Sequence, residues 1–243
     1  MSGVPARHHE CDSTFIVTPA VRASKYGHVG VVVWFTGLPC SGKSTLARAL
    51  ESHLVNRGVH VAVLDGDDIR GSVNSDLGFS AVDRRENVRR VAEIARLLAH
   101  AGTVAVAALV SPYEQDRQAA RAIVTRGDPD ALFCQVFLDV PVATCERRDV
   151  RGWYAKARAN LASEFTGISA PYQAPRDSEI TLRTDEHGVD ACVSRLMDFL
   201  APRIRRDVRE GDIASNARGR DFSTYNVRPR AVVPASSARR QQH

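Results

Sequence analysis

Short apolar runs alternate with longer amphipathic stretches through the middle of this chain. The apolar runs, rich in β-branched residues, predict five strands, at residues 29–36, 60–65, 103–110, 133–139 and 180–183. Helical periodicity between them predicts five helices, at residues 43–57, 83–101, 114–126, 142–147 and 189–200. Gly58 and Gly102 follow the two longest helices, where a left-handed residue is favoured. This alternation indicates a mainly parallel sheet with helices on both faces, a three-layer α/β/α domain.

The patterned region has the size of one domain, and both ends of the chain differ from it. We place the domain at residues 28–201 of the 243, which is long enough to bury a core. Residues 1–27 show no clear pattern and are expected to form an extension. Residues 202–243 hold ten arginines and four acidic residues, so this tail accounts for the net charge of +5. A solvated, mobile tail is the favoured interpretation; a nucleic-acid-binding arm is the alternative, weakened because only Phe222 and Tyr225 interleave its basic residues.

Composition gives no sign of a membrane or secreted protein. No apolar run approaches the ~20 residues that span a bilayer, and the first residues lack a signal-peptide pattern. The cysteines are odd in number, scattered and without metal-ligand spacing: Cys11, Cys40, Cys134, Cys145 and Cys192. We therefore expect reduced thiols and a cytoplasmic protein.

A glycine-rich segment follows the first predicted strand directly. Residues 37–45 read GLPCSGKST and contain a complete GxxxxGK[ST] phosphate-binding loop. Its glycines let successive N–H groups face one phosphate chain, and the next helix adds its positive dipole end. Lys43 can reach the β- and γ-phosphates, and the Ser44 hydroxyl can ligate Mg²⁺. A chance turn is the alternative, disfavoured by the strand before and the helix after. We predict a phosphate-loop NTPase-type fold that binds ATP through Gly37, Leu38, Pro39, Cys40, Ser41, Gly42, Lys43, Ser44 and Thr45.

Three acidic residues cluster where the second predicted strand ends. Asp65, Asp67 and Asp68 surround Gly66, and the Mg²⁺ of a nucleotide would offset their mutual repulsion. We predict that Asp67 activates the acceptor or binds a metal ligand, with Asp65 in support. The alternative is that these acids cap the next helix, which we favour for Asp68. Arg70, one turn further on, suits an anionic group of the substrate.

A lone aromatic residue stands in the polar stretch that follows. Phe79 would find a partner by stacking on a base. Arg84 and Asn87 fall three residues apart on one helix face, where they could read a phosphate-like group and a base or ribose.

These segments together resemble the adenylylsulfate (APS) kinase family. The shared motifs are the phosphate loop, LDGDDIR at 64–70, NSDLGFS at 74–80, DRRENVRR at 83–90 and VSPY at 110–113. The likeness continues through RDVRGWYAKAR at 148–158, FTGI at 165–168 and PYQAP at 171–175, so it covers about residues 29–200. It implies transfer of the γ-phosphoryl group of ATP to the ribose 3′-hydroxyl of adenosine 5′-phosphosulfate, with Mg²⁺ as cofactor and a lid at about 149–175. We also expect a homodimer and functional coupling to an ATP sulfurylase.

The resemblance assigns roles to individual residues. Phe79 and Phe165 would sandwich the adenine of the acceptor, and Lys156 in the lid would approach the transferring phosphoryl group. The remaining acceptor contacts, to the phosphosulfate and the base, would come from Arg70, Arg84 and Asn87. Ser111 corresponds to a serine often designated a phosphoserine intermediate. We instead predict that Ser111 positions the substrate, because transfer between two bound nucleotides needs no enzyme nucleophile and no base is adjacent in sequence.

The chain departs from the family pattern at a few positions. Pro39 and Cys40 stand where small residues such as Ser-Gly are usual, and Asp68 replaces a frequent Asn. In the lid, Ala155 replaces a frequent Lys. None of these changes affects the triphosphate chemistry, but they leave open an alternative acceptor, another 5′-substituted nucleotide.

Overall fold

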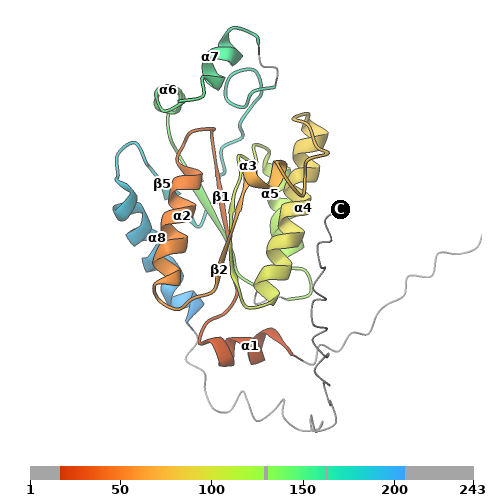
Figure 1. Ribbon diagram of the computed structural model, residues 1–243, viewed down its shortest axis with the longest axis vertical. Coiled ribbons are helices and arrows are strands. Elements are labelled where there is room, and N and C mark those ends of the chain that lie inside the picture. The colour runs from red at the N-terminus through yellow and green to blue at the C-terminus, as the bar shows by residue number, and fades with distance from the viewer. Residues whose placement is uncertain (1–16, 129–130, 162–163, 206–243) are drawn as a thin grey trace, which may run out of the picture. The chain divides into compact units, whose positions relative to one another are not determined.

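The computed structural model describes residues 17–128, 131–161 and 164–205 (Figure 1). Predictions for residues before 17, and for the arginine-rich tail beyond 205, lie outside the described residues. Five strands form one sheet in the order β2-β3-β1-β4-β5, and every neighbouring pair is parallel. Their bounds are β1 Val32–Gly37, β2 Val61–Asp65, β3 Val104–Ala108, β4 Phe133–Leu138 and β5 Ile180–Leu182. The predicted five-stranded parallel sheet is confirmed.

Helices cover both faces of the sheet (Figure 1). On one face lie α2 (Lys43–Val55) and α8 (Val189–Ile204), which contact each other. On the other lie α4 (Ala81–His100) and α5 (Glu114–Val124), also in mutual contact. A shorter helix, α6 (Val142–Arg147), follows β4. This is the predicted three-layer arrangement, and within the described residues no helix is long and apolar enough to cross a membrane.

The central strand β1 explains why both faces need a helical cover. Val33 and Phe35 point into one apolar core, whereas Val32 and Trp34 point into the other. Alternate residues of a strand face opposite sides, so a fully apolar strand is stable only when both sides are buried. Residues 31–36 are all buried completely, which fixes the position of the loop that follows β1.

Three short helices were absent from the sequence prediction. They are α1 (Pro19–Tyr26), α3 (Gly66–Arg70) and α7 (Trp153–Arg158). The expectation that residues 1–27 form an unpatterned extension is wrong for α1. This helix is marked by the capping residues at its two ends and not by a hydrophobic periodicity. Thr18 accepts a hydrogen bond from the N–H of Val21, Pro19 occupies the first turn, and Gly27 ends the helix at φ 72°.

The last helix also extends beyond its predicted end. α8 continues through Pro202 to Ile204, whose side chain is buried in the core beside Leu200. The domain boundary placed at 201 therefore falls inside a helix, and the folded region reaches at least residue 204.

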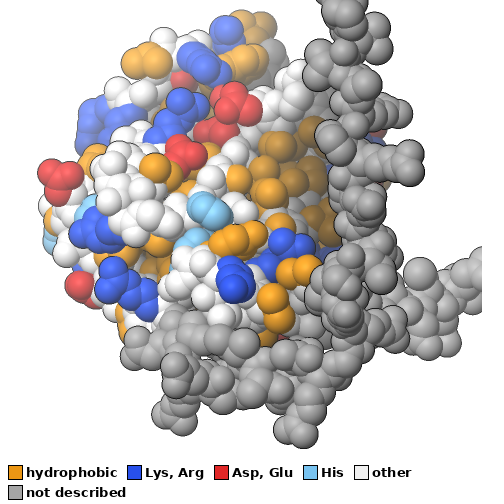
Figure 2. Space-filling model, turned by 60° about the horizontal axis from the view of Figure 1, so that its bottom comes forward, with side chains coloured by type: hydrophobic (Ala, Val, Ile, Leu, Met, Phe, Trp, Pro, Cys, Tyr) orange, Lys and Arg blue, Asp and Glu red, His pale blue; other side chains and the backbone are white. Residues whose placement is uncertain are grey.

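Two exposed rings, of Tyr26 and His60, surround the buried His28 at the end of the sheet opposite the phosphate loop. The His28 ring is 5.3 Å from that of His60, and the Tyr26 ring is 4.9 Å from His60. The backbone N–H of His60 donates to Nε2 of His28 at 3.2 Å, and Nδ1 of His28 lies 3.4 Å from the carbonyl oxygen of Val29. His28 is therefore held as the neutral tautomer with its proton on Nδ1. Histidine side chains are visible on this face of the molecule, among apolar and basic ones (Figure 2).

We expect His28 to make the fold acid-sensitive. Burial lowers the pKa of His28 below its usual 6.5, so the unfolded chain binds a proton more readily than the folded one. The stabilisation is complete above pH 6.5 and is lost as pH falls below it, by at most about 1.4 kcal/mol per pH unit. Urea unfolding at pH 7.5 and 5.5 should show a larger loss for the wild type than for His28→Gln. An equal loss in the two proteins would contradict the role of His28; His53→Gln, at a partly exposed site on α2, provides the matched control.

Candidate active site

The phosphate loop lies at the carboxyl end of the central strand. β1 ends at Gly37 and α2 begins at Lys43, so residues 38–42 form the turn between them. Gly37 has φ 150° and Gly42 has φ 102°, both in the region that favours glycine. A Cβ atom on Gly37 would lie 2.9 Å from the carbonyl oxygen of Leu138. Cys40 adopts φ 60° although it is not glycine, and burial raises the pKa of its thiol, so the thiol remains protonated near neutral pH.

Lys43 carries a desolvated positive charge at the start of α2. Its side chain is 8% exposed, and burial lowers its pKa to about 8. The ammonium group donates to the carbonyl oxygens of Gly37 (3.0 Å) and Leu38 (2.6 Å). A buried ammonium that is hydrogen-bonded only to neutral acceptors interacts strongly with any anion that reaches it. Ser44 and Thr45, next on the helix, are exposed.

Two side chains from distant segments donate hydrogen bonds to carbonyl oxygens of the loop. The hydroxyl of Thr184, just after β5, donates to the carbonyl oxygen of Ser41 at 2.8 Å. The hydroxyl of Tyr154 on α7 donates to the carbonyl oxygen of Pro39 at 3.0 Å. Beside the Thr184 contact lies a cavity of about 410 Å³, whose lining includes Cys40, Lys43, Ser44, Thr45, Arg148 and His187.

The acidic residues after β2 serve different purposes. Asp65 is buried and its carboxylate caps α3 by accepting from the N–H of Asp67 at 3.0 Å. The capping role assigned to Asp68 is therefore wrong: its exposed carboxylate lies 3.9 Å from Arg48. The carboxylate of Asp67 is also exposed and lies 3.2 Å from the guanidinium of Arg151. Of the three acids, Asp67 is thus the one beside the lid whose carboxylate is open to solvent and does not cap a helix.

The described residues contain no group of three or more His, Cys, Asp or Glu side chains that could hold a metal ion. Mg²⁺ in nucleotide sites is usually held by one or two protein oxygens together with phosphates and water. The exposed hydroxyl of Ser44 and the carboxylate of Asp67 are oxygen donors of this kind, so the side chains present fit a nucleotide-bound Mg²⁺.

An aromatic ring and two guanidinium groups form what we call the acceptor cluster: Arg70, Phe79 and Arg84. The Phe79 ring is 59% exposed. The guanidinium of Arg70 lies 4.5 Å from its centroid, and that of Arg84 lies 5.6 Å away. Backbone carbonyls orient both arginines, with Arg70 donating to Gly78 (2.6 Å) and Arg84 to Phe79 (2.8 Å). The cluster offers a flat apolar face beside two fixed positive charges, which suits a base attached to an anionic group.

Asn87 is buried on α4 and bonded to a residue that sequence reasoning missed. Its Oδ1 accepts from Nδ2 of Asn74 at 2.9 Å. Asn74 is completely buried, and its own Oδ1 has no partner among the described residues. The two amides form a buried pair behind the acceptor cluster, so Asn74 positions Asn87.

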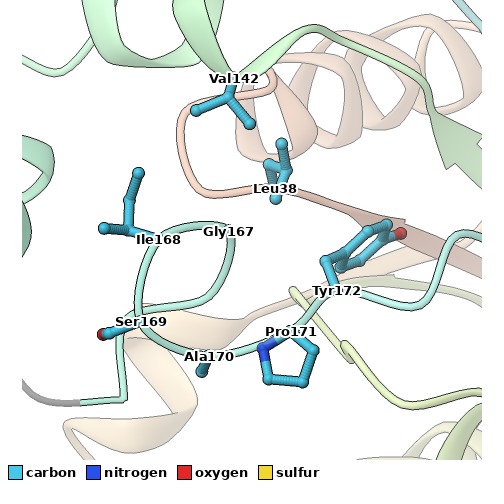
Figure 3. Close-up of a pocket in the computed structure, with 8 residues that line it drawn as sticks. All are labelled: Leu38, Val142, Gly167, Ile168, Ser169, Ala170, Pro171 and Tyr172. Carbon is cyan, nitrogen blue, oxygen red and sulfur yellow. The ribbon is translucent and has the colours of Figure 1, made fainter.

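Phe165 comes from the segment predicted to form a lid, but its side chain is partly in the core. Its ring meets the buried Tyr154 ring edge-on, with centroids 4.8 Å apart. The side chain of Arg84 donates to the carbonyl oxygen of Glu164 at 2.7 Å, which ties this segment to the acceptor cluster. A cavity of about 460 Å³ is lined by residues of this segment and by Leu38 and Val142. Leu38 and Val142 lie across the cavity from residues 167–170 (Figure 3).

Ser111 is held in an unusual backbone conformation after β3. It has φ 36° and is 3% exposed. Its hydroxyl oxygen accepts from the indole N–H of Trp34 at 3.2 Å, and its carbonyl oxygen accepts from Arg117 at 2.7 Å and Thr36 at 3.4 Å. Among the described residues, no histidine or carboxylate is hydrogen-bonded to this hydroxyl. Because the indole occupies a lone pair, the hydroxyl proton remains free to be donated.

Lys156 lies on the exposed side of α7. Its ammonium is 4.7 Å from the centroid of the Trp153 ring, a cation–π contact within the lid.

Sequence reasoning missed the residues that support the site rather than form it. They are Trp34, Asn74, Arg117, Tyr154 and Thr184. Arg117 is completely buried and links the Ser111 carbonyl to Glu114 and to the carbonyl of Gln173 (2.6 Å). Their roles depend on tertiary contacts: Trp34, Tyr154 and Thr184 bond to residues 77, 115 and 143 positions away in the chain.

Comparison of the sequence with known proteins gives a consistent result. The profile of the family described as "Adenylylsulphate kinase" matches residues 29–183. The adenylyl-sulfate kinase of Shewanella amazonensis is 47% identical over 184 residues, covering 76% of this chain and 91% of the relative. That of Escherichia coli is 49% identical over 184 residues, covering 76% and 89%.

Solved structures agree with the sequence relatives. The APS kinase CysC of Mycobacterium tuberculosis, in complex with AMPPNP and APS, is 43% identical with a TM-score of 0.68. The alignment covers 71% of this chain and 98% of that one. The protein APE1195 is 37% identical with a TM-score of 0.66, over 72% and 96% of the two chains.

Proposed function

Because the chain belongs to the adenylylsulfate kinase family, we propose that it transfers the γ-phosphoryl group of ATP to the ribose 3′-hydroxyl of adenosine 5′-phosphosulfate. The products are 3′-phosphoadenosine 5′-phosphosulfate and ADP. The observation that carries the proposal is a complete phosphate loop with a buried lysine, at the same edge of the sheet as the Arg70–Phe79–Arg84 acceptor cluster. The phosphate loop suits a triphosphate, and the acceptor cluster suits a base that carries an anion.

On the nucleotide side, we propose that the N–H groups of the phosphate loop and the start of α2 bind the triphosphate. Lys43 would leave the carbonyls of Gly37 and Leu38 and turn to the phosphate oxygens, where its charge offsets the charge that develops during transfer. Ser44, with Asp67 nearby, would hold Mg²⁺, which when bound neutralises phosphate charge and orients the γ-phosphoryl group.

On the acceptor side, Arg70 and Arg84 would bind the phosphosulfate group. Phe79 and Phe165 would bind the two faces of the adenine, and Asn87 its edge. Support comes from the exposure of Phe79 and from the Arg84 bond to the Glu164 carbonyl, which brings the Phe165 segment to the acceptor cluster.

Three further residues would act at the reacting centre. Asp67 would accept or orient the proton of the 3′-hydroxyl, since its carboxylate is exposed and bonded only at the surface. Lys156 would turn from Trp153 toward the phosphoryl group when the lid closes and excludes water. Ser111 would donate its hydroxyl proton to the substrate. In-line transfer between two bound nucleotides requires orientation and charge neutralisation, and these residues supply both.

The role of Ser111 gives a direct prediction. Ser111→Ala should retain measurable turnover, reduced by roughly 2- to 30-fold, because it loses one hydrogen bond of ~0.5–2 kcal/mol rather than a nucleophile. Mass spectrometry of the wild type incubated with ATP alone should find no phosphoserine at this position. A phosphoserine that forms and decays as fast as turnover would reverse the assignment.

A coupled assay tests the proposed function. ADP release should require adenosine 5′-phosphosulfate, and the product should carry a new 3′-phosphate. A panel of other 5′-substituted nucleotides should be turned over at least ~100-fold less efficiently, because they lack the sulfate of the phosphosulfate group that the two arginines bind. Faster turnover of another nucleotide would show that the acceptor differs.

We further propose that the enzyme is cytoplasmic, homodimeric and functionally coupled to an ATP sulfurylase that makes its acceptor. The four cysteines that the structure describes are all free thiols, in keeping with a reducing compartment. Gel filtration with light scattering tests the dimer, and adding an ATP sulfurylase to the assay tests the coupling.

A further inference from the structure

The phosphate loop and the lid touch at two successive loop residues. The side chain of Leu38 packs against Gly167, where an added Cβ would lie 2.8 Å from Leu38 Cδ2 (Figure 3). The carbonyl oxygen of Pro39 accepts the hydroxyl proton of Tyr154 at 3.0 Å. The loop that would bind ATP therefore rests directly on the segment that would bind the acceptor.

Tyr154 is the residue that connects the two sites. Its ring is completely buried and lies edge-on to Phe165, 4.8 Å between centroids. Its backbone N–H donates to the carboxylate of Asp149 at 2.7 Å, which fixes the start of α7. Burial raises the pKa of its hydroxyl, so the group stays protonated and acts as a donor. One end of this side chain contacts the nucleotide loop and its ring supports an aromatic residue of the acceptor site.

Nucleotide binding must rearrange the residue next to this contact. Lys43 now donates to the carbonyl oxygen of Leu38 at 2.6 Å and to that of Gly37 at 3.0 Å. An ammonium that turns to phosphate oxygens releases those carbonyls, and the backbone at 38–39 adjusts. Interfaces packed as closely as Leu38 on Gly167 change between discrete arrangements rather than deforming gradually. Such a rearrangement would be transmitted to the lid segment through the Leu38 and Pro39 contacts.

We propose that Tyr154 is a positioning residue that couples the two substrate sites, so that bound nucleotide strengthens acceptor binding through the Tyr154–Pro39 hydrogen bond. The inference rests on the proposed function, because it takes Phe165 as part of the acceptor site. Linkage requires the effect to be reciprocal: the acceptor must strengthen nucleotide binding by the same factor.

Calorimetric titration tests the coupling. The dissociation constant of adenosine 5′-phosphosulfate is measured with and without a saturating non-hydrolysable ATP analogue and Mg²⁺, and the ratio is the coupling factor. Tyr154→Phe keeps the ring and its packing but removes the hydroxyl. We expect its coupling factor to fall by about 3- to 10-fold relative to the wild type, the value of one hydrogen bond. The reciprocal titration should give the same ratio.

Thr184→Val is the matched comparison. It removes a hydroxyl bond of similar length to another carbonyl of the phosphate loop, that of Ser41. Arg148 also donates to this hydroxyl, and in the variant it keeps its second bond, to the carbonyl oxygen of Thr184 at 2.7 Å. We expect weaker binding of the ATP analogue with an unchanged coupling factor. A purely structural loosening of the loop would instead lower the coupling in both variants, and that result would overturn the proposal.

Two other outcomes are decisive. Suppose that the wild type makes 3′-phosphoadenosine 5′-phosphosulfate. If Tyr154→Phe then keeps the full coupling factor, or if the wild type shows no coupling between its substrates, the coupling role of Tyr154 is wrong and the proposed function stands. If the wild type fails to phosphorylate adenosine 5′-phosphosulfate, the proposed function fails first. Melting temperatures of both variants show whether they remain folded.

Discussion

Replacing Lys43 by alanine is expected to reduce turnover by about 1000-fold or more while the protein stays folded. Removing one preorganised charge that stabilises the transition state typically costs 10²–10³-fold in rate, and phosphoryl transfer depends almost entirely on such charges. Because Lys43 is 8% exposed and burial lowers its pKa to about 8, its charge is weakly screened by water and acts at close to full strength.

The fold should tolerate this change. In the absence of phosphate the ammonium bonds only to neutral acceptors, and burial of a charge without an ionic partner does not favour the folded state. ADP release and the melting temperature are the two measurements. Lys25→Ala, an exposed lysine on α1 at the opposite end of the sheet, should keep wild-type turnover. Near-normal activity of folded Lys43→Ala would refute the phosphate-loop assignment.

Phe79→Ala should raise the Michaelis constant for adenosine 5′-phosphosulfate by roughly 10- to 100-fold. A base stacked on an aromatic ring gains ~1–3 kcal/mol, and alanine offers no surface to replace it. The Michaelis constant for ATP should change little, because the phosphate loop binds ATP. The melting temperature should also change little, since 59% of the Phe79 side chain is already exposed.

Phe165→Ala is the informative partner of this experiment. The Phe165 ring packs on the buried Tyr154 ring, so its removal should lower the melting temperature as well as acceptor affinity. The two phenylalanines were predicted from sequence to be equivalent, and the structure separates them. If Phe79→Ala lowers the melting temperature and weakens both substrates together, Phe79 is a packing residue and the base-stacking role is wrong.

Local patterns were sufficient to predict the sheet and the phosphate loop. The apolar runs of β1, β3 and β4 are buried on both faces, so hydrophobicity alone marks them. The phosphate loop is contiguous, and Gly37 and Gly42 are required by the backbone of the loop itself. Lys43 could therefore be placed without knowledge of any distant residue.

Contacts between distant segments were not predictable in this way. Tyr154 bonds to Pro39, 115 residues away, and Trp34 to Ser111, 77 residues away. In the sequence, Tyr154 and Trp34 look like ordinary core residues. Most of each side chain is apolar, and only the hydroxyl of Tyr154 and the indole N–H of Trp34 make these hydrogen bonds. The capping bond of Asp65 was unpredictable for a related reason: a carboxylate at a strand end suits a cap and a metal equally well until the backbone shows which N–H it faces.

The short helices were missed because they bury too little surface to produce a periodic pattern. α3 has five residues and α7 has six, fewer than two full turns each. Their stability comes from caps and from tertiary contacts such as that of Tyr154, so sequence reasoning assigned them to loops.

The two tryptophans lie in different parts of the site, so their fluorescence can report on each part separately. Trp34 donates to the Ser111 hydroxyl at one side of the site, and Trp153 stacks against Lys156 in the lid. The chain contains no other tryptophan, so its tryptophan fluorescence, excited at wavelengths that tyrosine does not absorb, arises from these two places alone. In Trp153→Phe, the emission of Trp34 reports the polarity around Ser111. In a variant that lacks Trp34, the emission of Trp153 reports the surroundings of α7. Substrate arrival and the proposed lid movement can thus be timed separately in stopped flow, without attaching a dye.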